Sequence, residues 1–103
     1  MEKPTKVPKL GFYYHYKHDP KKDFNNYAYE VIGVALHSEE RNYTLLYRPL
    51  YSNTFLAPAN YVARPLGMFM EQVKIGGEDV PRFKLITDKE IIEKLEKIRG
   101  EMY

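Results

Sequence analysis

Three arginines that stand next to a proline are the first residues in this sequence with types suited to binding: Arg48, Arg64 and Arg82. A guanidinium group is always charged and presents a planar set of donors that matches a carboxylate or a phosphate. If the three side chains converge on one face of the fold, they form an anion site. Alternatively each arginine pairs with a carboxylate, because an arginine in a sheet is costly unless paired. The candidate carboxylates are Glu30, Glu39, Glu40 and Glu71.

A polar segment, H-S-E-E-R-N at residues 37–42, brings an imidazole close to two carboxylates. His37 with Glu39 or Glu40 could act as an acid/base or recognition cluster, because an imidazole titrates near neutral pH. The other interpretation is a solvated turn, for which serine and glutamate are ordinary residues. Both interpretations stay open from the sequence.

Tyrosine is unusually frequent, with 10 residues in a chain of 103. A tyrosine combines an apolar ring with a polar tip, so it suits both the core of a small barrel and a recognition surface. Six tyrosines could form an aromatic cage or a base-stacking platform: Tyr14, Tyr16, Tyr29, Tyr47, Tyr51 and Tyr61. From all these groups the sequence predicts one set of ligand-binding residues, namely Tyr16, His37, Glu39, Arg48, Tyr51, Arg64 and Arg82.

Other site types receive little support from the sequence. The chain has no cysteine, and His15, His18, Asp19 and Asp23 make only a weak metal-ligand pattern. The sequence shows no phosphate-binding glycine loop and no nucleophile elbow, so we expect no metal, no cofactor and no catalytic residue. A formal net charge of +2 is too small to indicate a polyanion partner by itself. No apolar run reaches the length of a membrane span and the first residues carry no apolar signal segment, so we expect a cytoplasmic protein.

The elements that must position these residues centre on a long hairpin. Residues 27–36 and 43–51 are rich in β-branched and aromatic residues and flank the polar turn. Gly33 predicts a bulge or a close backbone approach in the first strand, and Pro49 predicts a bend, a bulge or a sheet edge in the second. Alternation puts Ala28, Glu30, Ile32, Val34 and Leu36 on one face and Tyr27, Tyr29, Val31, Gly33 and Ala35 on the other.

The rest of the chain predicts further short strands and a single clear helix. Strands are expected at residues 11–17, 61–64, 71–75 and 80–86, with a loop at 52–60 and a tight turn at 65–70. The helix is expected to start with Thr87 as its cap and Glu90 completing a capping box, and its apolar stripe should cover the open end of a barrel. The prediction is one mainly β domain: an extended or disordered basic arm at 1–10, a small β-barrel of five or six strands at 11–86, and a C-terminal helix at 87–103.

Five ordered segments make a family resemblance visible: G-F-Y-Y-H-Y-K-H (11–18), Y-E-V-I-G-V-A-L-H-S-E-E (29–40), L-L-Y-R-P-L-Y (45–51), A-R-P-L-G-M-F-M-E-Q-V (63–73) and V-P-R-F-K-L-I (80–86). Together they resemble the small bacterial family called domain of unknown function 1653. The resemblance implies an SH3-like β-barrel and no activity. Two features depart from the family pattern: the loop at 18–26 is longer, and Val62 stands where the family has an aromatic residue, with Tyr61 one place earlier.

We therefore expect a non-catalytic binding module that recognises an anionic ligand, a peptide or a nucleic acid through its tyrosines and arginines. One alternative is a small enzyme acting on a nucleotide or modified base, with His37 and Glu39 as acid and base and Arg64 or Arg82 holding an anion. A second alternative is a dimeric scaffold that associates through its helix or an open sheet edge. A monomer or a homodimer without a membrane partner fits all three.

Overall fold

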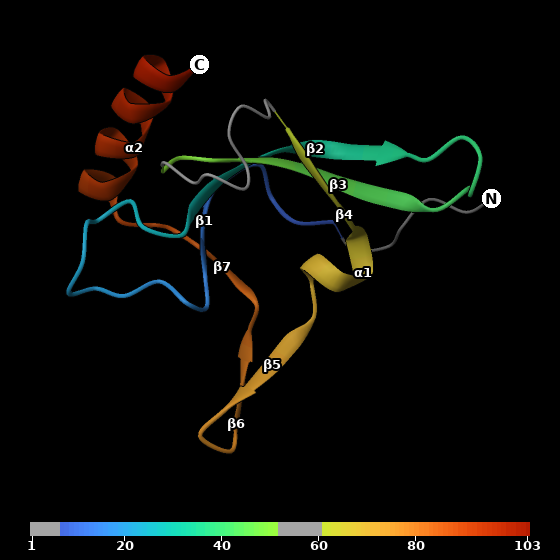
Figure 1. The fold of residues 1–103 in the computed structure, drawn as a ribbon, viewed down its shortest axis with the longest axis horizontal. Helices are drawn as coiled ribbons and strands as arrows, with labels where there is room; N and C mark the ends of the chain where they lie inside the picture. Colours follow the sequence, from blue (N-terminus) through green and yellow to red (C-terminus); the bar gives the residue numbers. More distant parts are fainter. Residues whose placement is uncertain (1–6, 52–60) are drawn as a thin grey trace.

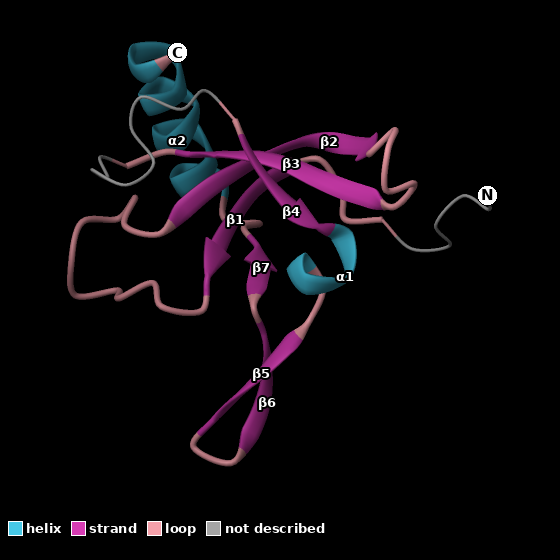
Figure 2. Ribbon diagram, turned by 45° about the vertical axis from the view of Figure 1, so that its right-hand side comes forward, coloured by secondary structure: helices cyan, strands magenta, loops and turns pink. Residues whose placement is uncertain are grey.

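The computed structural model describes residues 7–51 and 61–103, and in these ranges the chain forms seven strands and two helices. Five strands form one antiparallel sheet in the order β4-β3-β2-β1-β7 (Figure 1). Their bounds are β1 (Gly11–His15), β2 (Ala28–Leu36), β3 (Tyr43–Pro49), β4 (Val62–Pro65) and β7 (Phe83–Leu85). The remaining two, β5 (Gln72–Ile75) and β6 (Glu78–Pro81), pair as a separate ribbon that projects away from the sheet (Figure 2).

The expected hairpin is the centre of the sheet, and its bulge changes which side chains share a face. In the register of β2 and β3, Val31 lies opposite Tyr47 but Gly33 lies opposite Leu46, so Ile32 is the extra residue. The bulge predicted at Gly33 is therefore confirmed. Beyond it the alternation is shifted by one, and Val34 lies opposite the buried Leu45. The face assignment expected for Val34 and Leu36 was wrong, because one inserted residue moves all later side chains of a strand to the other face.

Each face of the sheet carries its own apolar cluster. One cluster contains Tyr29, Leu45, Tyr47, Phe69 and Phe83, and the short helix α1 (Leu66–Phe69) contributes Phe69 to it. We call this side of the sheet the tyrosine face. The other cluster consists of Phe12, Ala28, Leu50, Ile86 and Leu95.

The second helix, α2 (Lys89–Met102), covers the face opposite the tyrosines, which we call the helix face. Leu95 of α2 is completely buried there, and Ile91, Ile92 and Ile98 pack around it. The helix therefore covers one face of the sheet, and the expectation that it covers the open end of a barrel was wrong. The mainly β class with a C-terminal helix is confirmed. Within the described ranges β4 and β7 are the two edges of the sheet, and no closed barrel is formed there.

The start of α2 lies one residue later than the sequence predicted. Asp88 is the N-cap, and its carboxylate accepts hydrogen bonds from the N–H groups of Glu90 (2.9 Å) and Ile91 (3.2 Å). The expectation that Thr87 caps the helix was wrong, because the aspartate that follows has the extended backbone and the acceptor geometry of a cap.

Some expectations fall on parts of the chain outside this description. Residues 1–6 of the expected basic arm and the expected loop at 52–60 lie outside the described residues. Residues 7–10 form neither helix nor strand. Neither helix in the described ranges has the length and apolar character that a membrane crossing requires.

Candidate anion-binding site

His15, at the end of β1, lies at the centre of the most chemically suggestive cluster on the tyrosine face. Its ring meets Phe83 edge-on at 5.0 Å between centroids and stacks against Tyr27 at 5.6 Å. The Nδ1 atom accepts a hydrogen bond of 3.2 Å from the backbone N–H of Lys17. The proton of the neutral ring is therefore on Nε2, which makes Nε2 a hydrogen-bond donor.

The environment of His15 keeps the ring neutral. Burial first, and then the positive charges of Arg64, Lys17 and Arg82 in that order of importance, together lower the pKa of His15 to about 4. At neutral pH the side chain therefore offers an uncharged N–H group beside two guanidinium groups. An anion bound there would offset the positive charges and so reduce the lowering of the His15 pKa.

Arg64 reaches the same cluster from β4. Its Nε donates to the hydroxyl oxygen of Tyr47 at 3.1 Å, and its guanidinium carbon lies 5.7 Å from the centroid of the Phe83 ring. These two contacts fix the side chain over the tyrosine face, where it acts on His15. Among the described residues, no carboxylate lies within ion-pair distance of Arg64.

Arg82, between β6 and β7, adds a second guanidinium group. One of its terminal nitrogens lies 3.5 Å from a carboxylate oxygen of the half-exposed Glu71. Its Nε atom is buried and has no hydrogen-bond partner within the described part of the chain. A buried donor without an acceptor is costly, so this N–H is a place where a ligand oxygen would be stabilising.

Tyrosines form the wall next to His15. The hydroxyl groups of Tyr29 and Tyr51 share a hydrogen bond of 2.5 Å, and burial followed by this hydrogen bond raises the pKa of Tyr29. The ring of Tyr27 lies between His15 and Tyr51, with 5.6 Å between centroids on either side. Tyr27 holds this position with a φ of 55°, which is unfavourable for a bulky side chain and is often found at functional sites.

Arg48 does not belong to this cluster, because it lies on the helix face. Its Nε and one terminal nitrogen contact the same carboxylate oxygen of Glu30 at 3.0 Å and 2.9 Å. Arg99 of α2 binds the other oxygen of Glu30 at 2.6 Å, and Tyr103 stacks on the Arg48 guanidinium at 4.2 Å. Arg48 is thus part of the contact between the sheet and α2.

His37 and Glu39 lie in the turn of the long hairpin. The Nδ1 atom of His37 accepts a hydrogen bond from the backbone N–H of Glu40 at 3.1 Å, and its backbone N–H donates to the carbonyl oxygen of Asn42 at 2.8 Å. The backbone N–H of His15 donates to the carbonyl oxygen of Tyr27, the residue before β2. His37 is the residue after the end of this 9-residue strand. A strand of this length separates the two histidines by roughly 25–30 Å.

The structure therefore brings together four of the residues expected to bind a ligand: Tyr16, Tyr51, Arg64 and Arg82. Tyr16 joins them because its ring lies 4.4 Å from that of His15. The sequence-based set missed His15, Tyr27 and Phe83. A signal for His15 was present, because the alternation of the first strand places it on the same face as the buried Tyr13.

Fold and site define a small, mainly β domain with an arginine- and tyrosine-rich surface. Residues 11–85 match the family model described as a protein of unknown function (DUF1653), and the chain belongs to this family. Its structure is similar to the crystal structure of a DUF1653 protein from Bordetella bronchiseptica, with a TM-score of 0.59 and 27% sequence identity over 79% of this chain and 94% of that chain. The comparison with curated proteins gives no match. The family match ends before α2, so this helix lies outside the region that the family model covers.

Proposed function

We propose that the protein is a non-catalytic binding module that holds the anionic group of a small ligand between Arg64, Arg82 and the Nε2–H of His15. One observation carries the proposal: two guanidinium groups from separate elements act on a neutral histidine, and the buried Nε of one of them has no partner within the described residues. Guanidinium and neutral N–H donors together match the oxygens of a phosphate or a carboxylate.

The surroundings favour a ligand with a planar part next to its anionic group. The partly buried Tyr27 and Tyr51 have their rings beside the cationic side chains, and base–aromatic stacking contributes about 1–3 kcal/mol per base in other proteins. A formal net charge of +2 and the partial pairing of Arg82 with Glu71 support a small ligand better than a polymer with many phosphates. We therefore propose a mononucleotide-like ligand.

We also interpret the sheet and its ribbon as an SH3-like arrangement, the architecture that the family resemblance implies. In this interpretation the tyrosine face corresponds to the inner, concave side of the sheet. Small β-barrel domains of this kind often bind ligands over an aromatic surface.

The test is a titration of the protein with adenosine monophosphate, adenosine and inorganic phosphate, followed by NMR and calorimetry. We expect the monophosphate to bind, adenosine to bind much more weakly, and the pKa of His15 to rise on binding. Arg64→Gln and Arg82→Gln should each weaken binding about tenfold, since each removes one charge-assisted contact. The matched control is Arg41→Gln in the hairpin turn, which should bind like the wild type.

Equal affinity for adenosine and its monophosphate would contradict the proposal, as would shifts that avoid His15. Affinity should also fall as salt concentration rises, because the contact is electrostatic. The enzyme alternative required His37 beside the arginines, and His37 instead lies at the other end of β2 from His15. The dimeric scaffold stays a prediction, for which the edges of β4 and β7 are the available surfaces.

A further inference from the structure

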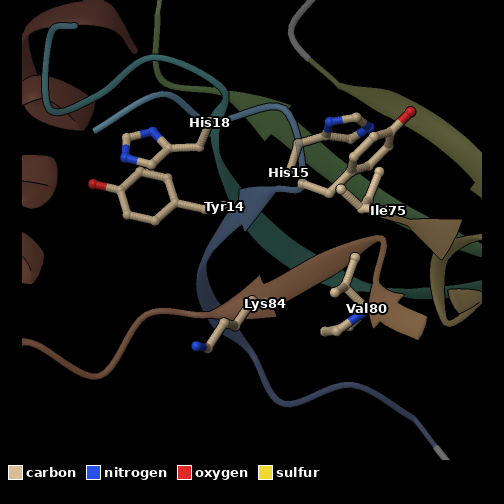
Figure 3. A pocket seen from close by; sticks show the side chains of 8 residues that line it. Tyr14, His15, His18, Ile75, Val80 and Lys84 are labelled. Carbon is tan, nitrogen blue, oxygen red and sulfur yellow. The ribbon is translucent and has the colours of Figure 1, made fainter. Parts of the chain in front are cut away.

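A concavity lies beside the arginine cluster and shares His15 and Tyr16 with it. It is an open cavity of about 410 Å³ between the loop that follows β1 and the β5–β6 ribbon (Figure 3). Residues with three different chemistries line it: Tyr14, Tyr16 and His18 are aromatic, Ile75 and Val80 are aliphatic, and Lys84 is cationic.

The aromatic side of the cavity is held in place before any ligand arrives. The rings of Tyr14 and His18 are stacked, with centroids 3.6 Å apart and planes inclined by 16°. The hydroxyl group of Tyr14 donates to the carbonyl oxygen of Phe24 at 2.5 Å, and Nδ1 of His18 bonds to the carbonyl oxygen of Asn26 at 2.7 Å. Such preorganisation lowers the entropic cost of binding a flat molecule against these rings.

The ribbon supplies an aliphatic side that faces these rings. Figure 3 shows Tyr14 and His18 on one side of the cavity and Ile75 and Val80 on the other. Ile75 is 51% exposed, which is high for a large apolar side chain and leaves its surface available to a ligand. Aromatic rings on one side and aliphatic groups on the other suit a planar apolar molecule.

Lys84 adds a charge at the edge of the cavity (Figure 3). Among the described residues, no carboxylate lies within ion-pair distance of its amino group. An ammonium group beside an apolar cavity attracts an anionic group on the ligand.

We propose that this cavity binds a small planar molecule that carries one carboxylate, with its ring between the Tyr14–His18 stack and the ribbon and its carboxylate at Lys84. The site is separate from the proposed anion-binding site. On β7 the neighbouring Phe83 belongs to the tyrosine face, and consecutive side chains of a strand point to opposite faces, so Lys84 points away from Arg64. His15 and Tyr16 also line the cavity, and the two sites touch through these two residues.

The experiment uses two probes of the same shape, naphthoate and its uncharged amide, naphthamide, titrated into the full chain and followed by amide NMR. We expect the largest saturable shifts from naphthoate at Tyr14, His18, Val80 and Lys84. Lys84→Met should weaken naphthoate binding about fivefold and change naphthamide binding less than about twofold. The control is Lys74→Met, on the β5–β6 ribbon but outside the cavity lining, which should leave both affinities unchanged.

A second variant tests the apolar wall. Val80→Asp places a negative charge in the cavity and should abolish naphthoate binding while the amide spectrum stays dispersed. The proposal is overturned if naphthoate gives no saturable shifts up to about 10 mM. It is also overturned if Lys84→Met and Lys74→Met behave alike, or if the largest shifts map to Arg64. This last result would leave the proposed function standing, because it assigns the anion to the other site.

Discussion

At the scale of single residues, Glu30 is the charge on which the contact between sheet and helix depends. Its side chain is 11% exposed and its two oxygens bind Arg48 and Arg99. Breaking a buried ion pair by neutralising one partner is strongly destabilising, because the remaining charge stays buried without compensation.

We therefore expect Glu30→Gln to lower the free energy of unfolding by about 3 kcal/mol. Urea denaturation followed by circular dichroism measures this change. Glu40→Gln in the exposed hairpin turn is the control and should change stability by less than about 0.5 kcal/mol. Equal stability of the two variants would show that the Glu30 ion pairs contribute no net stability.

The half-buried His15 makes stability depend on pH. Its pKa is about 4 in the folded protein against 6.5 in the unfolded chain, so the unfolded state binds a proton first as the pH falls. The stability that neutral His15 contributes is therefore present above pH 6.5, decreases between pH 6.5 and 4, and is absent below pH 4.

Between pH 7 and pH 4.5 the wild type should lose about 2 kcal/mol more stability than His15→Gln, because glutamine does not titrate. Urea unfolding of both proteins at the two pH values gives the difference. If both lose the same amount, the ring of His15 is more accessible to water than its contacts indicate.

Residue types alone predicted part of the candidate site. Arg64, Arg82 and Tyr51 were chosen because guanidinium groups and tyrosines suit recognition, and they do lie around His15. Arg48 was chosen for the same reason, although strand alternation places its side chain on the other face of β3 from that of Tyr47. The pairing of Arg48 with Glu30 and of Arg82 with Glu71 was one of the alternatives that the sequence left open. The choice between pairing and convergence depends on side-chain direction, which composition does not determine.

At the scale of elements, the start of α2 gives a paired test of capping. Asp88 accepts two backbone hydrogen bonds, so Asp88→Ala should lower stability by about 1 kcal/mol. Thr87→Ala removes the residue that the sequence suggested as the cap and should have little effect. Thermal unfolding of both variants compares them directly, and a larger loss for Thr87→Ala would contradict the observed cap.

The order of most elements was predictable from local sequence, whereas their faces were not. Alternation, proline and glycine gave the long hairpin, most of the short strands and the C-terminal helix near their observed positions. The strand expected at 80–86 is instead two strands, β6 and β7, in different sheets, and the turn expected at 65–70 contains α1. The bulge at Ile32 was expected from Gly33, but its effect on Val34 and Leu36 depends on which side of the glycine the extra residue falls. The packing of Val31 and Leu45 in the core decides where the extra residue lies, and a local sequence pattern carries no information about this packing.

At the scale of the whole molecule, the helix face makes α2 a structural part of the domain. The family match ends at residue 85, yet Phe12, Ala28, Leu50 and Ile86 are buried in one cluster with Leu95 of α2. Without the helix these side chains would present a continuous apolar surface to water.

Deletion of residues 87–103 should therefore cost more than about 3 kcal/mol of stability and promote self-association. Thermal unfolding together with light scattering detects both effects. A truncated protein that stays monomeric and as stable as the full chain would show that the family region is sufficient by itself. The milder variant Leu95→Ala should show the same direction of change with the chain length unaltered.

The pairing of Glu30 with Arg99 joins residues 69 positions apart. While the chain is being synthesised, β2 and β3 can pair and Arg48 can already neutralise one oxygen of that carboxylate. The second oxygen meets its partner only after about fifty more residues, up to Arg99, have been added. Until α2 is complete, the nascent domain therefore carries an incompletely compensated acidic group on an uncovered apolar surface.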